Sequence, residues 1–308
     1  MIQVITKGGM GNQMFQYAFA LQVKRLNPSD AIYLNGGWHS FMNDARRLSL
    51  GHFCLDEQVK EVSRFRSLLF LGAFFAATIR SLGLGNSIGF LKHSKEVLRR
   101  CAQRLFLDGV YFTPEIFYVP QARVGKGNKH LCGYYQNPSV VEGIEDELRK
   151  AFTVRTPASD ANRQLLAEIE SHNAVCLHVR RGDYSLFSQL QVCNEAYYAE
   201  AVRLAVAELE SPVFYVFSTG HEDIEWVRRN YKFDADVRFV DLDNPDYEEI
   251  RLMMACRHFI ISNSTFSWWA AVLSNRSENK RVWMPGRWLN GVDVQMGFPS
   301  WTVVSVES

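Results

Sequence analysis

A regular alternation of strand-like and helix-like segments in the second half of the chain restricts its fold more than any other feature. Short apolar runs typical of buried strands alternate with segments of helical length. The expected order is helix 158–171, strand 174–179, helix 195–209, strand 213–217, helix 223–230, strand 237–240, helix 247–256 and strand 258–262. Such an alternation is typical of a parallel sheet with helices on both faces. We therefore expect an α/β fold, with a Rossmann-like domain over residues 156–308.

The first half begins with a similar pattern. A strand is expected over residues 2–6, then a glycine-rich loop over residues 8–13, and then a helix from about Met14 to Leu26. Further along we expect a mainly helical segment 55–110, a polar loop 121–130 and an acidic helix 140–152. Because 308 residues exceed the length over which one hydrophobic core keeps growing, a second α/β domain is expected over residues 1–155, with a cleft between the two.

The composition excludes several classes of function. Hydrophobic residues make up 47% of the chain, and 34 basic residues against 33 acidic ones leave a net charge of +1. A nucleic-acid partner is therefore not expected. The cysteines are scattered and no C-x-x-C pair occurs, which favours reduced thiols in a cytoplasmic protein over a disulfide framework.

The most membrane-like segment is Ser67–Ile79, which is shorter than the roughly 20 residues needed to span a bilayer. Because arginines flank it, we interpret it as a buried helix, with an interfacial helix as the alternative. The N-terminus lacks the basic and long apolar regions of a signal peptide. A cytoplasmic location is expected, and peripheral association with the inner face of the membrane, near a lipid-linked acceptor, remains open.

The heptapeptide His178–Tyr184 places several charges where the strand that begins at Ala174 ends. Ligands of open α/β sheets bind outside the carboxyl ends of the strands, and a guanidinium can donate two parallel hydrogen bonds to a phosphate. Neighbouring side chains of an extended segment point to opposite faces, so only one of Arg180 and Arg181 can easily reach a given ligand. The other is then free for Asp183 or another carboxylate. The alternative is a solvent-exposed arginine pair.

A second anion-competent loop, Gly8–Gln13, joins a strand to a helix. Glycines such as Gly9 and Gly11 permit close approach of the backbone to a ligand, and a helix N-terminus offers unpaired N–H groups. Asn12 and Gln13 add side-chain hydrogen-bonding groups. A purely structural glycine-rich turn is the alternative.

The third such loop is Ser262–Ser267, in which four hydroxyls and one asparagine exceed what a single helix cap needs. All of these groups can donate to phosphate oxygens, whereas Trp268 and Trp269 after them are expected in the core. Three anion-competent loops at strand ends indicate a substrate that carries a diphosphate. A Walker nucleotidase is disfavoured because no G-x-x-x-x-G-K-[ST] is present.

Two Asp-x-Asp triplets, Asp234–Asp236 and Asp241–Asp243, are candidate metal ligands. The second triplet is better placed, because it follows the strand expected at 237–240. The arginines nevertheless provide a metal-free way to neutralise a leaving diphosphate, so no metal or other cofactor is expected. The histidines form no motif that would hold zinc.

These motifs resemble the bacterial α-1,2-fucosyltransferases of glycosyltransferase family 11. The resemblance covers GGMGNQMFQYAFA from residue 8, GYYQNPSVVEGIEDELRKAF from residue 133, HVRRGDY from residue 178, DNPDYEEIRLMMACRHFIISNSTFSWWAAVL from residue 243 and PGRWLN from residue 285. The blocks span most of the chain. The combination of HVRRGDY with SNSTFSWWAA, in this order, is specific.

The resemblance implies a GT-B-like fold of two Rossmann-type halves facing a cleft. It also implies GDP-β-L-fucose as the donor and inverting, metal-free transfer to the 2-hydroxyl of a terminal galactose in an O-antigen or a similar surface polysaccharide. Arg180 would hold the β-phosphate of the donor, and Asn12 would lie near the reacting centre. These two residues and Asp183 are the candidate catalytic residues. The candidate donor-binding residues are His178, Arg181, Gly9, Gly11, Ser264, Thr265 and Ser267.

Within this scheme residues 156–308 bind GDP-fucose and residues 1–155 bind the acceptor. The acceptor site would include Trp38, His39 and the segment 55–110. One departure from the family's pattern concerns the Phe-Ser-Asp-Asp that commonly follows a strand in the second half. Here Phe217-Ser218 is followed by Thr219-Gly220-His221-Glu222-Asp223, so the acid is either displaced to Glu222 or Asp223, or absent.

Three other functions stay open at this point. They are a non-catalytic nucleotide- or glycan-binding protein on the same scaffold, a fucosyltransferase of different linkage, and a phosphate-ester enzyme that uses the arginine pair. The presence of Asn12, Arg180 and the hydroxyl-rich loop favours an active transferase over a binding protein. The lack of paired metal-ligating clusters disfavours a two-metal phosphatase.

Overall fold

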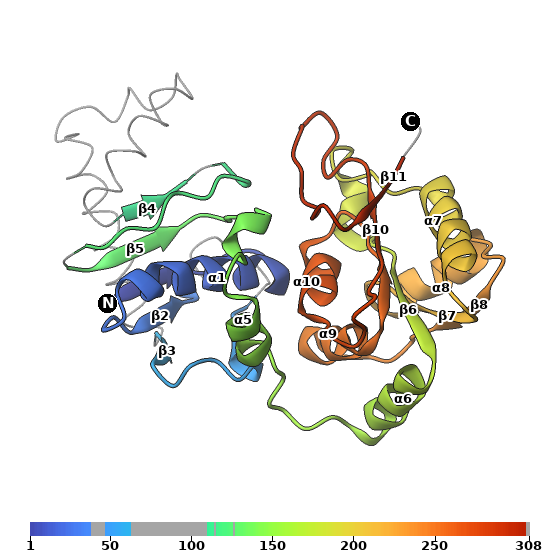
Figure 1. Cartoon of the computed structure of the whole chain (residues 1–308), viewed down its shortest axis with the longest axis horizontal. Helices are drawn as coiled ribbons and strands as arrows, with labels where there is room; N and C mark the ends of the chain where they lie inside the picture. The colour runs from blue at the N-terminus through green and yellow to red at the C-terminus, as the bar shows by residue number, and fades with distance from the viewer. Residues whose placement is uncertain (38–46, 63–109, 114, 126, 306–308) are drawn as a thin grey trace. The chain divides into compact units, whose positions relative to one another are not determined.

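The structure, a computed structural model, describes residues 1–37, 47–62, 110–113, 115–125 and 127–305 (Figure 1). The chain forms two compact units. The first consists of Met1–Gly51 and Leu55–Ala151, and the second of His52–Cys54 and Phe152–Ser308. Each unit contains its own parallel sheet.

The first unit has a five-stranded sheet in the order β3-β2-β1-β5-β4, and every neighbouring pair is parallel. Its strands are β1 (Ile2–Ile5), β2 (Ile32–Asn35), β3 (Val59–Glu61), β4 (Val110–Phe112) and β5 (Lys129–Cys132). Its helical segments include α1 (Met10–Leu26), the 3-10 turn η3 (Pro138–Val140) and α5 (Glu145–Ala151), and the 3-10 turn η1 (Leu50–His52) crosses from the first unit into the second.

Helix α1 is buried along most of its length and packs on this sheet. The ring of Phe19 contacts those of Tyr111 on β4 and Tyr135 after β5, with ring centroids 5.7 and 4.5 Å apart. The helix begins at Met10, about four residues earlier than expected from the sequence, with Gly9 as its N-cap. Burial of the helix against the sheet outweighs the low helix propensity of Gly11. Asn12 therefore lies in the first helical turn and not in a loop.

The second unit has a six-stranded sheet in the order β11-β10-β9-β6-β7-β8. All neighbouring strands are parallel. The strands are β6 (Asn173–His178), β7 (Pro212–Phe217), β8 (Asp236–Phe239), β9 (His258–Ile260), β10 (Val282–Pro285) and β11 (Thr302–Val304). Between them lie η4 (Gly182–Leu186), α7 (Glu195–Glu208), α8 (Gly220–Asn230), α9 (Asp246–Ala255) and α10 (Thr265–Leu273), and α6 (Asp160–Ser171) precedes β6.

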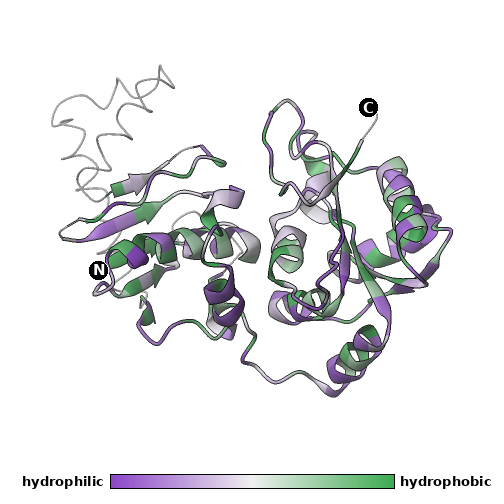
Figure 2. Cartoon of the chain, in the orientation of Figure 1, coloured by the Kyte–Doolittle hydropathy of each residue, from purple (hydrophilic) through white to green (hydrophobic). Residues whose placement is uncertain are grey.

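Helices cover both faces of this sheet, with α7 and α8 on one side and α9 and α10 on the other (Figure 1). Strands β6 and β7 are therefore buried almost throughout, as is usual for parallel strands between two helical layers. In contrast, α6, α7 and α8 carry both hydrophilic and hydrophobic residues (Figure 2), because each helix has one buried and one solvent-facing side.

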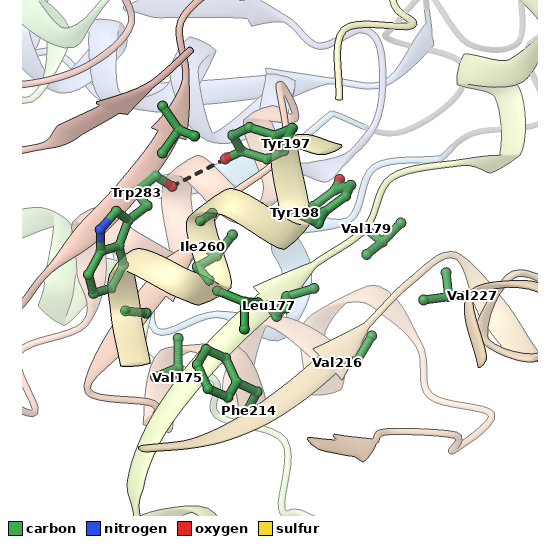
Figure 3. Packing of buried hydrophobic residues seen from close by; sticks show 14 of the residues in the cluster. Val175, Leu177, Val179, Tyr197, Tyr198, Phe214, Val216, Val227, Ile260 and Trp283 are labelled. Carbon is green, nitrogen blue, oxygen red and sulfur yellow. Dashed lines mark hydrogen bonds between the residues drawn. The ribbon is translucent and has the colours of Figure 1, made fainter. Parts of the chain in front are cut away.

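The core between the sheet and α7 and α8 is built from alternate residues of the strands. Val175, Leu177 and Val179 of the β6 segment pack there against Tyr197 and Tyr198 of α7 (Figure 3). Since side chains alternate across a strand, Cys176 and His178 point to the opposite face, toward α9 and α10. This alternation decides which residues of β6 can approach the loop after β9.

A short segment from the first half of the chain, His52–Cys54, belongs to the second unit. Phe53 forms an isolated antiparallel bridge with Val154, and its buried ring lies 5.5 Å from that of Phe152. His52 stacks on Tyr247 of α9, with ring centroids 3.8 Å apart and an interplanar angle of 12°. We call these three residues, His52–Cys54, the crossing segment.

The alternation expected between residues 158 and 262 is confirmed, and its boundaries agree to within about three residues. Three expectations in the first half are wrong. Residues 59–61, placed in a mainly helical segment, form β3. The polar loop ends earlier than expected because β5 starts at Lys129. The acidic helix 140–152 is divided into η3 and α5, and Gly143 between them has φ +71°, a conformation that favours glycine over other residues. Most of the segment 55–110, including Ser67–Ile79, lies outside the described residues.

Candidate active site

The strand order of the second sheet predicts where a ligand binds. Strands β6, β7 and β8 follow one another in one direction, whereas β9, β10 and β11 continue from the other side of β6. The direction of the chain thus reverses between β6 and β9. Ligands of open α/β sheets bind at such a switch point, outside the carboxyl ends of the strands. The segment 179–184, which we call the arginine loop, follows β6, and Ser262–Ser267, the hydroxyl-rich loop, follows β9. Two of the three loops singled out in the sequence therefore flank this point.

His178, the last residue of β6, connects these two loops. Its imidazole is buried, and Nδ1 lies 3.0 Å from Oγ of Ser262, just after β9. Burial, together with the nearby charge of Arg180, lowers the pKa of His178 to about 3. The imidazole is therefore neutral at physiological pH. In this arrangement it joins the two strand ends and is covered by protein.

Arg180 lies in the loop directly after β6, and its side chain is partly exposed. Its Nη1 donates a 3.0 Å hydrogen bond to Oγ1 of Thr219, which precedes α8. The guanidinium carbon also lies 5.1 Å from the ring centroid of Tyr184, whose hydroxyl donates to the backbone of Asn263 in the other loop. These contacts place the guanidinium at the switch point.

Arg181 has different surroundings. Its guanidinium carbon lies 3.3 Å from the ring centroid of Trp226 on α8, and its Nε lies 3.6 Å from a carboxylate oxygen of Asp223. The carboxylate paired with this arginine is therefore Asp223, one of the two residues to which the sequence left the displaced acid. The structure does not describe the side chain of Asp183.

The hydroxyls of the third loop are divided between structural and accessible groups. Ser264 caps α10 by accepting a hydrogen bond from the backbone N–H of Phe266, and the buried Ser267 donates to the carbonyl of Ser264. Thr265, the first residue of α10, is partly exposed. Trp268 and Trp269 are fully buried, as expected. Of the three hydroxyl residues predicted to bind the donor, Thr265 is the one exposed at the N-terminus of α10.

Glu249 is a residue that the sequence reasoning missed. It lies in the first turn of α9, on the face of the sheet toward which His178 points. Desolvation and the charge of Asp246 raise the pKa of its carboxyl, and Arg180 opposes the shift, so that the pKa lies at about 8. A partly buried acid with a raised pKa, close to a phosphate-binding candidate, is typical of functional sites. The sequence feature that could have identified Glu249 is its position in a helix that follows the end of a strand.

The first unit has a switch point of its own, between β1 and β5. Asn12, at the start of α1 after β1, accepts a 2.8 Å hydrogen bond at Oδ1 from Nε2 of Gln136, which follows β5. This contact fixes the orientation of the Asn12 amide. Gln136 lies in the block GYYQNP that carries part of the resemblance, but the sequence reasoning gives it no role. Its signal is a position four residues after the end of β5.

The glycines before Asn12 have distinct roles. Gly8 has φ +75°, and a Cβ there would lie 2.3 Å from Nδ2 of Asn12, so a side chain at this position would displace the asparagine. Around Gly9, by contrast, a Cβ would meet no other heavy atom within 4 Å, which leaves room for a ligand. Gly11 is buried in the first turn of α1.

Gln13 is not available to a ligand as the sequence suggested. Its side chain is buried and bonds to three backbone groups, the carbonyls of Gly8 and Arg47 and the N–H of Ser49. Trp38 and His39, expected near the acceptor, lie outside the described residues.

Asp241, in the second of the two Asp-x-Asp triplets, is paired with a histidine. Both carboxylate oxygens of Asp241 lie 2.9 Å from Nδ1 of His221, and this pairing raises the pKa of the exposed imidazole. Within the described residues, no group of three or more His, Cys, Asp or Glu side chains is arranged to hold a metal ion. In the same part of the chain, no helix is both long and apolar enough to cross a membrane.

The two parallel sheets, each with its helices, have the architecture of the GT-B fold, as expected from the sequence. Among solved structures, NodZ α-1,6-fucosyltransferase from Bradyrhizobium, soaked with GDP-fucose, shares the fold with a TM-score of 0.50 and 15% identity, over 88% of this chain and 91% of that one. The chain belongs to glycosyl transferase family 11, whose family model matches residues 106–282.

Relatives of known name support the same family. The chain is 31% identical to an α-1,2-colitosyltransferase of Escherichia coli, over 87% of this chain and 86% of the relative. It is 26% identical to the O-antigen biosynthesis glycosyltransferase WbnK of Escherichia coli, over 92% and 93%. A galactoside α-(1,2)-fucosyltransferase 1 of Saimiri boliviensis boliviensis is 30% identical over 47% of this chain and 42% of its own length.

Proposed function

We propose that this chain is an inverting α-1,2-fucosyltransferase, which transfers L-fucose from GDP-β-L-fucose to the 2-hydroxyl of a terminal galactose in a surface glycan. The observation that carries the proposal is the position of Arg180, held by Thr219 at the switch point of the second sheet, in a chain of family 11. Relatives named for α-1,2 transfer of colitose and of fucose support the linkage.

The proposed reaction requires the second unit to stabilise negative charge on the leaving diphosphate. The 2-hydroxyl attacks the anomeric carbon from the face opposite GDP and releases its proton as the bond to the diphosphate oxygen breaks, so the β-linked donor gives an α-linked product and GDP. Negative charge develops on the leaving diphosphate as the bond breaks. Arg180 can stabilise it with two parallel charge-assisted hydrogen bonds, and the N-terminus of α10 at Thr265 adds a partial positive charge. Such preorganised charges contribute most when water is excluded.

The first unit is assigned to the acceptor and to the sugar being transferred. Asn12 supports this assignment, because Gln136 orients its amide at the carboxyl edge of the first sheet. An amide held in one orientation can donate a hydrogen bond to a sugar hydroxyl without losing side-chain entropy on binding. Asp183 stays a candidate catalytic residue on the basis of its place in the HVRRGDY block.

The donor sugar has one specific competitor. The relative that is 31% identical is named for colitose, the 3-deoxy form of L-fucose. A site that hydrogen-bonds the 3-hydroxyl of fucose would discriminate strongly against colitose, whereas an apolar surface there would accept both. GDP-fucose is proposed as the donor, and GDP-colitose is the comparison that decides.

The experiment is incubation of the purified protein with GDP-fucose or GDP-colitose and a panel of galactosides, with the product linkage determined by NMR. The proposal expects an α-1,2-linked fucoside of galactose, with turnover from GDP-fucose exceeding that from GDP-colitose. An α-1,3 or α-1,6 product would contradict the linkage. Tight binding of GDP-fucose without turnover on any galactoside would instead favour a non-catalytic binding protein.

A further inference from the structure

One side of α8 contacts the arginine loop at consecutive positions. Thr219, Asp223 and Trp226 are spaced four and three residues apart, so they lie on one face of the helix and its N-cap. Thr219 accepts from Arg180, Asp223 accepts from the backbone of Gly182, and Trp226 packs on Arg181. We call these three residues the α8 face.

The contact at Gly182 is the shortest of the set. Its N–H donates to Oδ2 of Asp223 at 2.8 Å, and the glycine has φ +41°. A Cβ at this position would lie 3.4 Å from Thr219 and 3.6 Å from Asp223. The backbone therefore approaches the helix closely, in a conformation that glycine adopts more easily than other residues. Because Gly182 is two residues from Arg180, this bond restricts the direction in which the Arg180 side chain leaves the backbone.

Arg181 reinforces the same contact. A guanidinium stacked on a tryptophan at 3.3 Å and close to a carboxylate is held by cation–π and charge attraction. Such an arginine is already engaged without a donor nucleotide. Arg180, by comparison, donates a hydrogen bond to the neutral hydroxyl of Thr219.

We propose that Asp223 is a positioning residue for donor binding, and that Arg181 anchors the loop and does not itself bind the diphosphate. The inference rests on the proposed function. Asp223 holds Gly182 and Arg181 against α8, and this fixes Arg180 where it meets the phosphates. It also gives a role to Asp223, one of the two residues to which the sequence left the displaced acid, because residues 219 and 223 share one helix face and both contact the loop.

The test compares GDP with GMP, because the two ligands differ by the β-phosphate. Calorimetry measures both affinities for the wild-type protein and for the variants Arg180→Ala and Asp223→Ala. We expect the ratio of GDP to GMP affinity to fall at least about tenfold in each single variant, a change of about 1.4 kcal/mol. In the double variant the losses should be clearly less than additive, because one residue acts through the other.

Two further variants separate positioning from stability. Asp223→Asn keeps an oxygen acceptor for Gly182 and should recover most of the ratio, whereas Asp223→Ser is too short to reach the glycine and should behave like Asp223→Ala. Asp223→Ser also serves if the alanine variant does not fold. Glu222→Ala, next to it on the exposed side of the same turn, is the matched control and should leave the ratio unchanged.

The outcomes distinguish this inference from the proposed function. If Arg180→Ala lowers the ratio and the folded Asp223 variants do not, Asp223 has no positioning role and the inference is wrong. If Arg180→Ala itself leaves the ratio unchanged, the phosphate role in the proposed function fails. A loss in Arg181→Ala as large as in Arg180→Ala, with calorimetry showing additivity between them, would mean that both arginines bind the diphosphate directly.

Discussion

Two adjacent arginines after β6 have the same chemistry and different neighbours, and these neighbours are the basis for the different roles proposed for them. Arg180 meets a neutral hydroxyl and a tyrosine ring, whereas Arg181 meets a carboxylate and an indole. A guanidinium that is already paired with a carboxylate and stacked would lose those contacts if it turned to a ligand. The neighbours that the fold gives to each guanidinium therefore distinguish two side chains of the same type.

We expect Arg180→Ala to lower turnover by about a hundredfold or more while the fold stays intact. The lost stabilisation of charge on the leaving diphosphate corresponds to roughly 3 kcal/mol in the transition state. Arg180→Lys should recover little, because an ammonium cannot supply two parallel hydrogen bonds. Steady-state kinetics with GDP-fucose, alongside circular dichroism to verify folding, make the measurement. Near wild-type turnover in a folded Arg180→Ala variant would remove Arg180 from the site.

The alternation of side chains along an extended segment predicts that only one of the two arginines can easily reach a given ligand, and the structure gives the two side chains different neighbours. The alternation cannot identify Asp223 or Trp226 as the partners of Arg181, because more than 40 residues separate them in the sequence and the contact exists only once α8 packs beside β6. Glu249 and Gln136 are missed for the same reason. Each is an ordinary polar residue until two strands bring it to a sheet edge.

Among the elements, β9 shows how one side chain can join three strands. His258, its first residue, accepts at Nδ1 from the backbone N–H of Arg281 before β10, at 3.1 Å. Its Nε2 lies 3.1 Å from Oδ1 of Asn173, the first residue of β6. A proton added at Nδ1 would face another donor. This geometry agrees with a pKa lowered to about 4 by burial and by the charges of Arg257 and Arg281.

Stability should therefore fall on acidification. The unfolded chain takes up a proton on this histidine near pH 6.5, whereas the folded protein does so only near pH 4. The contribution is complete above pH 6.5 and is lost as the pH falls from there to about 4, with a slope of at most about 1.4 kcal/mol per pH unit. Urea unfolding of the wild-type protein and of His258→Gln across this range should show a shallower pH dependence in the variant.

His221→Gln is the control for this experiment. Asp241 raises the pKa of His221, so any contribution of that pair is complete below pH 6.5 and decreases as the pH rises through the folded-state pKa. Removing His221 should not flatten the decline between pH 6.5 and 4. An equal flattening in both variants would mean that the effect of His258 is not specific.

The elements of the second half follow from the sequence because buried parallel strands and amphipathic helices leave opposite patterns. Those of the first half are harder to predict. Strands β2, β3, β4 and β5 have three or four residues each, too few for a period to become visible. The start of α1 is misplaced because the run of glycines around Met10 resembles a loop, although burial against the sheet makes Gly11 helical. The local sequence pattern therefore does not predict the bounds of an element whose stability comes mostly from packing.

For the whole molecule, the balance of charge around the leaving diphosphate determines whether a metal is needed. We expect activity to persist in EDTA, because Arg180 and the N-terminus of α10 supply positive charge at the switch point. The test is to measure turnover with and without EDTA, and again after addition of Mn²⁺ or Mg²⁺. Abolition by EDTA and recovery with either ion would make Asp241 and Asp243 a metal site and refute the charge argument.

The proposed division of work between the units has a kinetic signature. Asn12→Ala should lower kcat strongly and change GDP affinity little, because its contact with the sugar end strengthens mainly in the transition state. Calorimetry with GDP and kinetics with GDP-fucose on the same variant test this. Gln136→Ala should show a weaker form of the same pattern, since it only orients Asn12. If GDP binding collapses together with turnover, the glycine-rich segment belongs to the nucleotide site.

The crossing segment means that the chain cannot be divided into two halves by a single cut. His52–Cys54 hydrogen-bonds along residues 153–155, through Cys54 N to Thr153 O at 2.8 Å and Arg155 N to His52 O at 2.9 Å, and Phe53 covers Phe152. A fragment that starts near residue 155 would lack both sides of this pairing, and the ring of Trp269 would lose Phe152, one of its aromatic neighbours, whose centroid lies 5.4 Å away. Fragment complementation would therefore need a break elsewhere in the chain, so that His52–Cys54 and residues 153–155 stay in the same fragment.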